Sequence, residues 1–180
     1  MWAAQHITWT SPGKMITSGS LGTMGVGVPF AIGCHLANKD SLVLCIDGDS
    51  SFNMTSTELQ TILENKIPIK IAIMNDQRQQ MVHVWQQLFH NNRIVATENI
   101  NPDYKLLGKS YGIKTISCSS KKRLKKKIHD FLTYKGPVIA IFQVKPSMCF
   151  PLVSPGKALN DMILHESDIQ KIDDKENAPN

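Results

Sequence analysis

The amino-acid sequence predicts an α/β fold in which an open parallel sheet carries helices on both faces. Four short apolar runs have the length and the β-branched character of strands that are buried on both faces. Segments with helical signals lie between these runs, and the connections are short. With 180 residues, of which 42% are hydrophobic, the chain is long enough to bury one sizeable core.

Each expected strand is bounded by polar or turn-forming residues, and the four strands cover residues 41–47, 69–75, 113–118 and 137–144. Each expected helix follows a recognisable start or stop signal. In chain order these are an apolar helix within 18–38 after a glycine-rich turn, a helix from the capping box at 55–58 to about Asn65, a helix from Asn101-Pro102 to before Gly112, and a lysine-rich helix that ends before Gly136.

Residues 1–165 are expected to form one domain, and residues 166–180 a polar tail. From about Asp168 the tail has no core-forming pattern, so we expect it to be disordered. The chain has no run of 18 apolar residues, and its first 20 residues lack the charged start and apolar centre of a signal peptide. We therefore expect no membrane partner.

The net charge of +5 comes from one segment, because residues 121–127 carry six positive charges and the remainder carries −1. Apolar residues recur at helical spacing in and after this run, which makes the lysines the exposed face of a surface helix: Leu124, Ile128, Phe131 and Leu132. A nucleic-acid site is the weaker interpretation, since no aromatic residues lie between the basic ones. The cysteines, at 34, 45, 118 and 149, lack Cys-x-x-Cys spacing, which favours reduced thiols over disulfides or a metal cluster.

Acidic turns follow the first two strands. Asp49 follows the strand at 41–47, and Asn75 with Asp76 ends the strand at 69–75. One helix and one returning strand separate the turns, so both fall at the carboxyl edge of a parallel sheet, where ligands gather. Oxygen ligands there suit Mg²⁺, and the backbone amides of Ser50 and Ser51, ahead of the next helix, suit phosphate. The alternative is that these are ordinary turn residues, because Asp and Asn favour turns.

Four segments, MWAAQH, TSGSLGTMGVGVPFAIG, IDGDSSFNMTSTEL and MVHVWQQLF, together resemble the C-terminal cofactor-binding domain of the acetolactate synthase (acetohydroxyacid synthase) catalytic subunit. The Gly-Asp turn followed by about two dozen residues and an Asn pair is the fingerprint of thiamine-diphosphate enzymes. The resemblance extends from Met1 to about Leu164 and includes NPDYKLLGKSYGI and PLVSPGKA.

The resemblance implies a role for particular side chains and carbonyls. Asp49, Asp76 and the Arg78 carbonyl would hold Mg²⁺. The diphosphate would lie among residues from two turns: Gly48, Ser50, Ser51, Gln79, Gln80 and Met81. Met24 would hold the cofactor rings in a V, and the Gly22 carbonyl would accept from the pyrimidine amino group. Met81, Val82 and Trp85 would line the substrate channel.

The function so implied is decarboxylation of pyruvate and its condensation with a second pyruvate or with 2-oxobutyrate, in branched-chain amino acid biosynthesis. The cofactors would be thiamine diphosphate and Mg²⁺, with FAD in the full-length enzyme. The expected partners are N-terminal and middle domains, a second copy in a homodimer or higher oligomer, and a regulatory subunit. The expected location is the bacterial cytoplasm, or a plastid or mitochondrion in a eukaryote.

The chain departs from the family pattern at two residues. Asp76 stands where Asn is usual, and Gln80 stands where Gly is usual, which questions the local backbone conformation. The family's Gly-Gln-His-Gln stretch would lie before Met1, and the catalytic glutamate belongs to an N-terminal domain. This chain alone is therefore expected to be inactive. Other interpretations are another thiamine-diphosphate decarboxylase or carboligase, or a non-catalytic cofactor-binding fragment or subunit.

Overall fold

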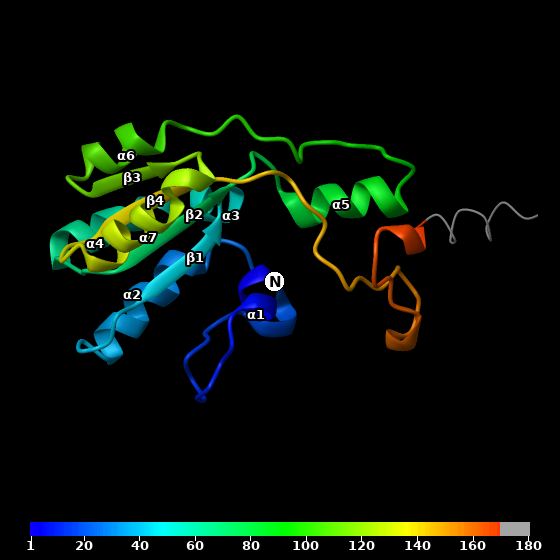
Figure 1. The fold of residues 1–180 in the computed structure, drawn as a ribbon, viewed down its shortest axis with the longest axis horizontal. Coiled ribbons are helices and arrows are strands. Elements are labelled where there is room, and N and C mark those ends of the chain that lie inside the picture. The colour runs from blue at the N-terminus through cyan, green and yellow to red at the C-terminus, as the bar shows by residue number, and fades with distance from the viewer. Residues whose placement is uncertain (170–180) are drawn as a thin grey trace, which may run out of the picture.

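The computed structural model describes residues 1–169, which contain one four-stranded parallel sheet (Figure 1). The strands lie in the order β1-β2-β4-β3. Their bounds fall within about three residues of those expected: β1 (Leu44–Gly48), β2 (Lys70–Asn75), β3 (Lys114–Cys118) and β4 (Val138–Gln143). The predicted open parallel sheet is confirmed.

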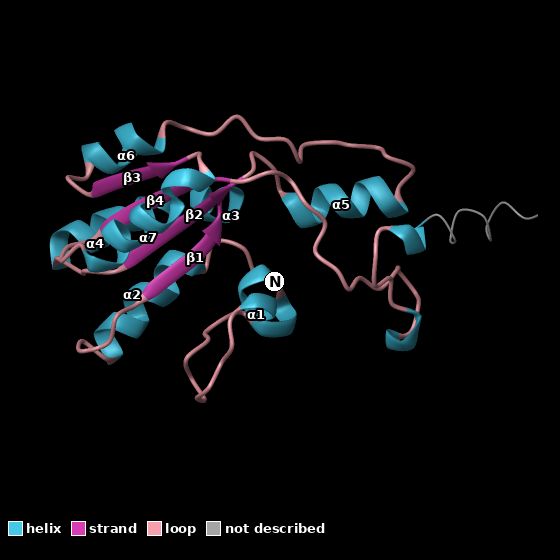
Figure 2. Cartoon of the chain, in the orientation of Figure 1, coloured by secondary structure: helices cyan, strands magenta, loops and turns pink. Residues whose placement is uncertain are grey.

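Helices cover both faces of the sheet, as predicted (Figure 2). The α-helices are α1 (Trp2–His6), α2 (Gly27–Ala37), α3 (Asp49–Met54), α4 (Leu59–Asn65), α5 (Gln80–Phe89), α6 (Tyr104–Ser110) and α7 (Leu124–Thr133). The larger core joins one face of the sheet to α2, α3, α4 and α6. The smaller core joins the opposite face to α7. In β2, Ile71 and Ile73 face the larger core and Ala72 faces the smaller one, so the middle of this central strand is buried and apolar on both faces.

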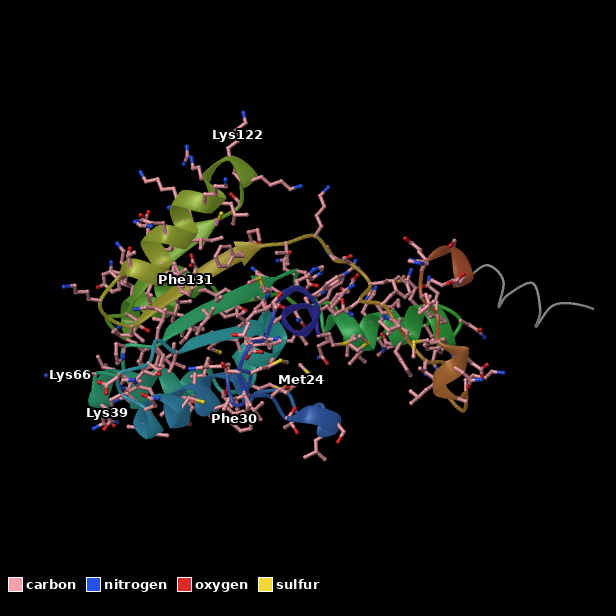
Figure 3. The ribbon with its side chains drawn as sticks, turned by 60° about the horizontal axis from the view of Figure 1, so that its bottom comes forward. Met24, Phe30, Lys39, Lys66, Lys122 and Phe131 are labelled. Atoms are coloured by element: carbon pink, nitrogen blue, oxygen red, sulfur yellow. The ribbon has the colours of Figure 1, made fainter. Side chains whose placement is uncertain are left out.

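The apolar side of α7 is less buried than its spacing predicts. Only Phe131 is buried; three neighbours on the same stripe are 37–38% exposed: Leu124, Ile128 and Leu132. Phe131 packs with Ile116 and Ala140 of the sheet. Figure 3 shows Phe131 on the side of α7 that faces the sheet and Lys122 pointing away from it.

The capping box expected at 55–58 does not form. Residues 56–58 make a 3₁₀ turn, and α4 begins only at Leu59. The Thr55 hydroxyl donates to the Gly25 carbonyl (2.7 Å), and Glu58 accepts from the Thr61 hydroxyl (2.8 Å). A partner 30 residues away in the chain therefore takes the hydroxyl that was expected to cap the helix.

Asn101-Pro102 does not begin α6, which starts later. Asp103 is the N-cap, and its carboxylate accepts from the backbone N–H groups of Lys105 (2.8 Å) and Leu106 (3.2 Å). This side-chain cap satisfies amides that lack a partner within the helix. Asn101 is therefore left in the preceding segment, where its side chain is available for other contacts.

A third apolar cluster lies beside the sheet domain, around α5 and the C-terminal segment (Figure 1). Val84 of α5 packs with Leu152 and Ile163, which pair by antiparallel backbone hydrogen bonds of 3.0 and 2.7 Å. Ile169, the fourth residue of the expected tail, packs against this cluster. Most of that tail, residues 170–180, lies outside the described residues.

All four cysteines are free thiols, and three of them are buried. Burial, together with the nearby Asp47 charge, raises the pKa of the Cys45 thiol to about 12. Within residues 1–169, no helix combines the length and the apolar character that crossing a bilayer requires.

Gly108 of α6 sits against the sheet so closely that a side chain does not fit. A Cβ there would lie 2.3 Å from the γ-methyl of Thr115 in β3. We expect Gly108→Ala to lower the free energy of unfolding by about 1–2 kcal/mol, because the β-branched Thr115 has little freedom to move away. Gly33→Ala in α2 is the matched control, since nothing lies within 4 Å of its Cβ position. Urea unfolding should show the control unchanged or slightly stabilised; equal effects of the two changes would contradict the close packing.

Candidate functional site

The two acidic turns lie side by side at the carboxyl edge of the sheet. Gly48 of β1 pairs with Met74 of β2, so Asp49, which follows Gly48, and Asn75, which ends β2, lie at the same level of the sheet edge. Both are removed from solvent, Asp49 at 0% and Asn75 at 7% exposure. Asp49 is the first residue of α3 rather than a turn residue, because the helix begins directly at the strand end.

An unexpected residue connects the turns. The Asn101 side-chain amide donates to Asp49 Oδ2 and to Asn75 Oδ1 (2.9 Å). Sequence reasoning read Asn101 only as part of a helix start, and 52 residues separate it from Asp49. The one signal in the sequence is a second asparagine two positions earlier, Asn99, whose amide donates to the Ser50 hydroxyl.

The other carboxylate oxygen of Asp49, Oδ1, is buried and has no hydrogen-bond partner. Burial raises the pKa of the Asp76 carboxyl, and the negative charge of Asp49 raises it further. Asp76 is therefore close enough to Asp49 for their charges to interact. An unpartnered buried oxygen beside a second carboxylate is costly unless a cation lies between them. These two residues therefore fit a divalent cation with oxygen ligands.

The loop that follows Asp76 is held in one conformation. Asp76 Oδ1 accepts from the Arg78 N–H (3.2 Å), and Gln77 between them adopts a left-handed backbone with φ of 59°. The Arg78 guanidinium forms an ion pair with Glu98 (3.2 Å). The Arg78 carbonyl, the third ligand that the resemblance implies, thus belongs to an ordered loop at the same edge.

The residues expected around a diphosphate come from two helix starts, not from two turns. Ser50 and Ser51 lie in the first turn of α3, and Gln80 and Met81 are the first residues of α5. The Ser51 hydroxyl accepts from the Gly25 N–H (2.9 Å). The expected turns are therefore short: Gly48 ends β1 directly before α3, and Gln79 is the N-cap of α5.

Gln80 does not distort the backbone, although the family has Gly at this position. Its backbone is helical and its φ is not positive. Its side-chain amide donates to the Ser147 carbonyl (3.2 Å), while Oε1 is buried without a partner. The departure therefore adds a side chain beside the site without requiring a conformation that only glycine adopts.

Gly22 ends a 3₁₀ turn at 19–21 in a left-handed conformation, with φ of 58°. Met24 follows it and is partly exposed. In the view of Figure 3 the Met24 side chain lies between the region of α2 and α5, toward the end of the sheet that carries the acidic residues.

The three residues assigned to a substrate channel share α5. Val82 is 42% exposed, whereas Met81 and Trp85 are partly buried against the small apolar cluster. Trp85 also packs edge-on against Phe89, with ring centroids 4.7 Å apart. Trp85 is thus held by packing on one side, which is compatible with lining a channel on the other.

A depression of about 430 Å³ lies at the carboxyl edge of the sheet, beside Asp76 and Arg78. It is lined from the ends of β2 and β4, from the loop after β2 and from the segment around Asn99; its acidic members are Asp76 and Glu98. Among residues 1–169, no group of three or more His, Cys, Asp or Glu side chains has metal-binding geometry. A metal here would therefore need carbonyl or ligand oxygens besides the two aspartates.

Residues 1–142 match the family described as "Thiamine pyrophosphate enzyme, C-terminal TPP binding domain". The chain belongs to this family. The match includes every candidate residue from Gly22 to Trp85, together with Asn99 and Asn101. The parallel sheet, with its acidic groups at the carboxyl edge, is thus the scaffold of a thiamine pyrophosphate (TPP) binding domain.

Curated relatives of this TPP-binding domain are named acetolactate synthases. The chain is 42% identical over 172 residues to the mitochondrial acetolactate synthase catalytic subunit of Saccharomyces cerevisiae, which covers 95% of the chain and 25% of the relative. It is 44% identical to the mitochondrial acetolactate synthase of Schizosaccharomyces pombe (93% and 25%). It is 38% identical to the isozyme 2 large subunit of Escherichia coli K12 (91% and 30%). The chain spans about a quarter of the length of these relatives.

Proposed function

We propose that this chain binds TPP and Mg²⁺ as the cofactor-binding domain of an acetolactate synthase catalytic subunit. One observation supports this above the others. Within a TPP-binding family domain, Asp49 keeps a buried, unpartnered Oδ1, and its charge acts on a second carboxylate, Asp76, which follows the end of the adjacent strand. Asp49, Asp76 and the Arg78 carbonyl would hold the metal, and phosphate oxygens and water would complete an octahedron.

The diphosphate would lie between Gly48, Ser50 and Ser51 on one side and Gln79, Gln80 and Met81 on the other. When bound, TPP supplies the carbon nucleophile that decarboxylates pyruvate and joins the remaining two-carbon unit to a second 2-oxo acid. Gly22 and Met24 would orient the cofactor rings. Met81, Val82 and Trp85 would exclude water and admit pyruvate or 2-oxobutyrate, and so protect the reactive carbon from protonation.

The proposed partners are the N-terminal and middle domains of the enzyme, the latter with FAD, a second copy of the catalytic subunit, and a regulatory subunit. The edge of β1 supports a contact with other polypeptide, because within residues 1–169 this strand pairs with β2 alone. Leu42, Leu44 and Ile46 are exposed there, and they line a groove of about 970 Å³ between β1 and α2. An exposed apolar sheet edge of this kind favours pairing with a further chain segment. Two of the relatives are named mitochondrial, which supports that location in a eukaryotic host.

Asp76→Asn should leave cofactor affinity unchanged or improve it. Asn keeps an oxygen ligand and removes a negative charge that lies beside both Asp49 and the incoming diphosphate. The same substitution should raise the melting temperature of the cofactor-free chain, because it removes the like-charge repulsion between the partly buried Asp76 and the buried Asp49. Calorimetric titration of TPP at saturating Mg²⁺ tests the first point. A loss of more than tenfold, about 1.4 kcal/mol, would mean that the charge of Asp76 is required.

The proposal is tested by separating binding from turnover. The purified chain should bind TPP in a Mg²⁺-dependent manner by calorimetry, yet form no acetolactate from pyruvate. Acetolactate should appear when a separately expressed fragment with the N-terminal and middle domains of a relative is added, because cofactor activation needs a positioned carboxylic acid that this site lacks; such a group contributes about 10²–10⁴ in rate.

Four other results would change the conclusion. Absence of Mg²⁺-dependent TPP binding would overturn the cofactor site. Turnover by the chain alone would refute the need for a second domain. Binding without turnover in either arm would favour a non-catalytic cofactor-binding subunit, and turnover of a 2-oxo acid without acetolactate would favour another decarboxylase or carboligase.

A further inference from the structure

Asn101 uses its whole side-chain amide to connect three side chains from two elements, α3 and β2. Its nitrogen donates to Asp49 Oδ2 at the start of α3 and to Asn75 Oδ1 at the end of β2 (2.9 Å). Its oxygen accepts from the Asn53 side chain, one turn further along α3 (3.0 Å). An amide with both donors and its acceptor engaged has one orientation, so its nitrogen stays directed at the two acceptors.

This arrangement fixes the direction of the Asp49 carboxylate. Oδ2 is held by Asn101, and Oδ1 is left buried and unpartnered, while the Asp49 charge acts on the nearby Asp76 carboxyl. Mg²⁺ requires near-ideal octahedral geometry, so a ligand that rotates loses affinity. We propose that Asn101 is the positioning residue of the metal site, which orients Asp49 so that Oδ1 is the metal ligand. This inference rests on the proposed function, because it concerns the same Mg²⁺ and TPP site.

The anchor of Asn101 is itself rigid. The Asn53 side-chain oxygen accepts from the Tyr104 hydroxyl (3.0 Å), and Tyr104 is 4% exposed. The Tyr104 ring packs edge-on against Phe52 of α3, with centroids 5.6 Å apart. The hydrogen-bond chain from Asp49 thus ends in the larger core, which does not adjust when one partner is lost.

The segment that carries Asn101 also holds the loop of the third proposed ligand. We name residues 97–101 the strap. The Gln79 N–H donates to the Thr97 carbonyl (2.9 Å), and the Asn99 N–H donates to the Gln77 carbonyl (2.8 Å). These bonds lie on either side of Arg78, so the strap fixes the Arg78 backbone and the Asp49 side chain together. Removing a residue that holds a metal ligand in position typically lowers the metal affinity by about 10–100-fold.

The test compares Asn101→Ala with Ile100→Ala in the full chain. Ile100 is the neighbouring strap residue, and its side chain is fully exposed. Mg²⁺ is titrated calorimetrically at saturating TPP, and Ca²⁺ is titrated in the same way, because Ca²⁺ accepts looser ligand arrangements. We expect Asn101→Ala to lower the affinity for Mg²⁺ about 10–100-fold and the affinity for Ca²⁺ less than about fivefold. Ile100→Ala should change neither by more than twofold.

A structural role alone would give a different pattern. If Asn101→Ala lowers the melting temperature but leaves the Mg²⁺ affinity of the folded protein within twofold, or weakens both ions equally, the inference is wrong. Asn101→Ser keeps one donor; it should weaken Mg²⁺ by less than Asn101→Ala, and it provides the comparison if the alanine variant does not fold. Binding by wild type with no effect in either variant overturns the positioning role and leaves the proposed function intact. Absence of Mg²⁺-dependent TPP binding in wild type overturns both.

Discussion

Replacing Asp49 by alanine should remove Mg²⁺-dependent TPP binding, with affinity falling by at least 100-fold, or about 2.8 kcal/mol. Asp49 supplies the buried oxygen that has no protein partner, and Asn75 beside it is already engaged by Asn101. The remaining groups do not complete an octahedron around a metal that tolerates little distortion. Isothermal titration calorimetry of TPP, with and without Mg²⁺, measures the loss.

The fold should survive this change. Asp49→Ala leaves the Asn101 amide bonded only to Asn75 among its two acceptors, which lowers stability. It also removes a charge near Asp76, which raises stability, so the two effects oppose each other. Asp40→Ala is the control, because Asp40 is an exposed carboxylate just before the segment that enters β1. Equal cofactor affinity in wild type, Asp40→Ala and Asp49→Ala would refute the metal assignment.

Lys70→Met should lower the free energy of unfolding by about 3 kcal/mol. Lys70 begins β2 at 2% exposure, and its ammonium donates to the carbonyls of Tyr134 and Gly136 (2.7 Å to the latter). Methionine fills similar space but leaves both carbonyls without this donor, and each hydrogen bond to a charged group contributes about 1.5–3 kcal/mol. Lys114→Met is the matched control: Lys114 begins β3, flanks the same residue of β4, Val138, and is exposed. Urea unfolding at pH 7 should show a small effect of Lys114→Met.

The effect of Lys70→Met should also depend on pH. Burial lowers the pKa of Lys70, so the native chain binds fewer protons than the unfolded chain between the two pKa values. Stability from this group therefore rises with pH and is complete above the unfolded pKa of about 10.4; it is lost as pH falls through the native value. The difference in unfolding free energy between wild type and Lys70→Met should grow from pH 7 to pH 10. A constant difference over that range would contradict the lowered pKa.

Local chemistry in the sequence was sufficient to predict the strands and the position of the acidic groups. The run at 69–75 is mostly apolar because both faces of β2 are buried. Such a run indicates a central strand whatever elements pack on it. Asp49 and Asp76 follow strands whose parallel pairing brings the strand ends together. The cofactor, metal and channel roles of the candidate residues stay proposals until binding is measured.

Contacts between distant residues were not predicted. Thr55 was expected to cap a helix, but its hydroxyl donates to Gly25, and Asn101 was read as a helix start although it connects Asp49 with Asn75. Each polar group has several possible partners, and the choice depends on which backbone and side-chain atoms the packed core brings within reach. The apolar stripe of α7 shows the same limit, because its spacing indicates a buried face but not how far the sheet extends beneath it.

The sequence by itself determined the parallel α/β fold, the edge of the sheet that carries the site and the two aspartates, because periodicity and turn chemistry are local properties of the chain. Only the tertiary structure decided that Asp49 keeps one oxygen free while Asn101 holds the other, and that the strap bonds to the backbone on either side of Arg78. The physical reason is that a buried carboxylate takes its orientation from the hydrogen-bond donors around it. Here that donor comes from a residue 52 positions away, which reaches Asp49 only after the core has packed.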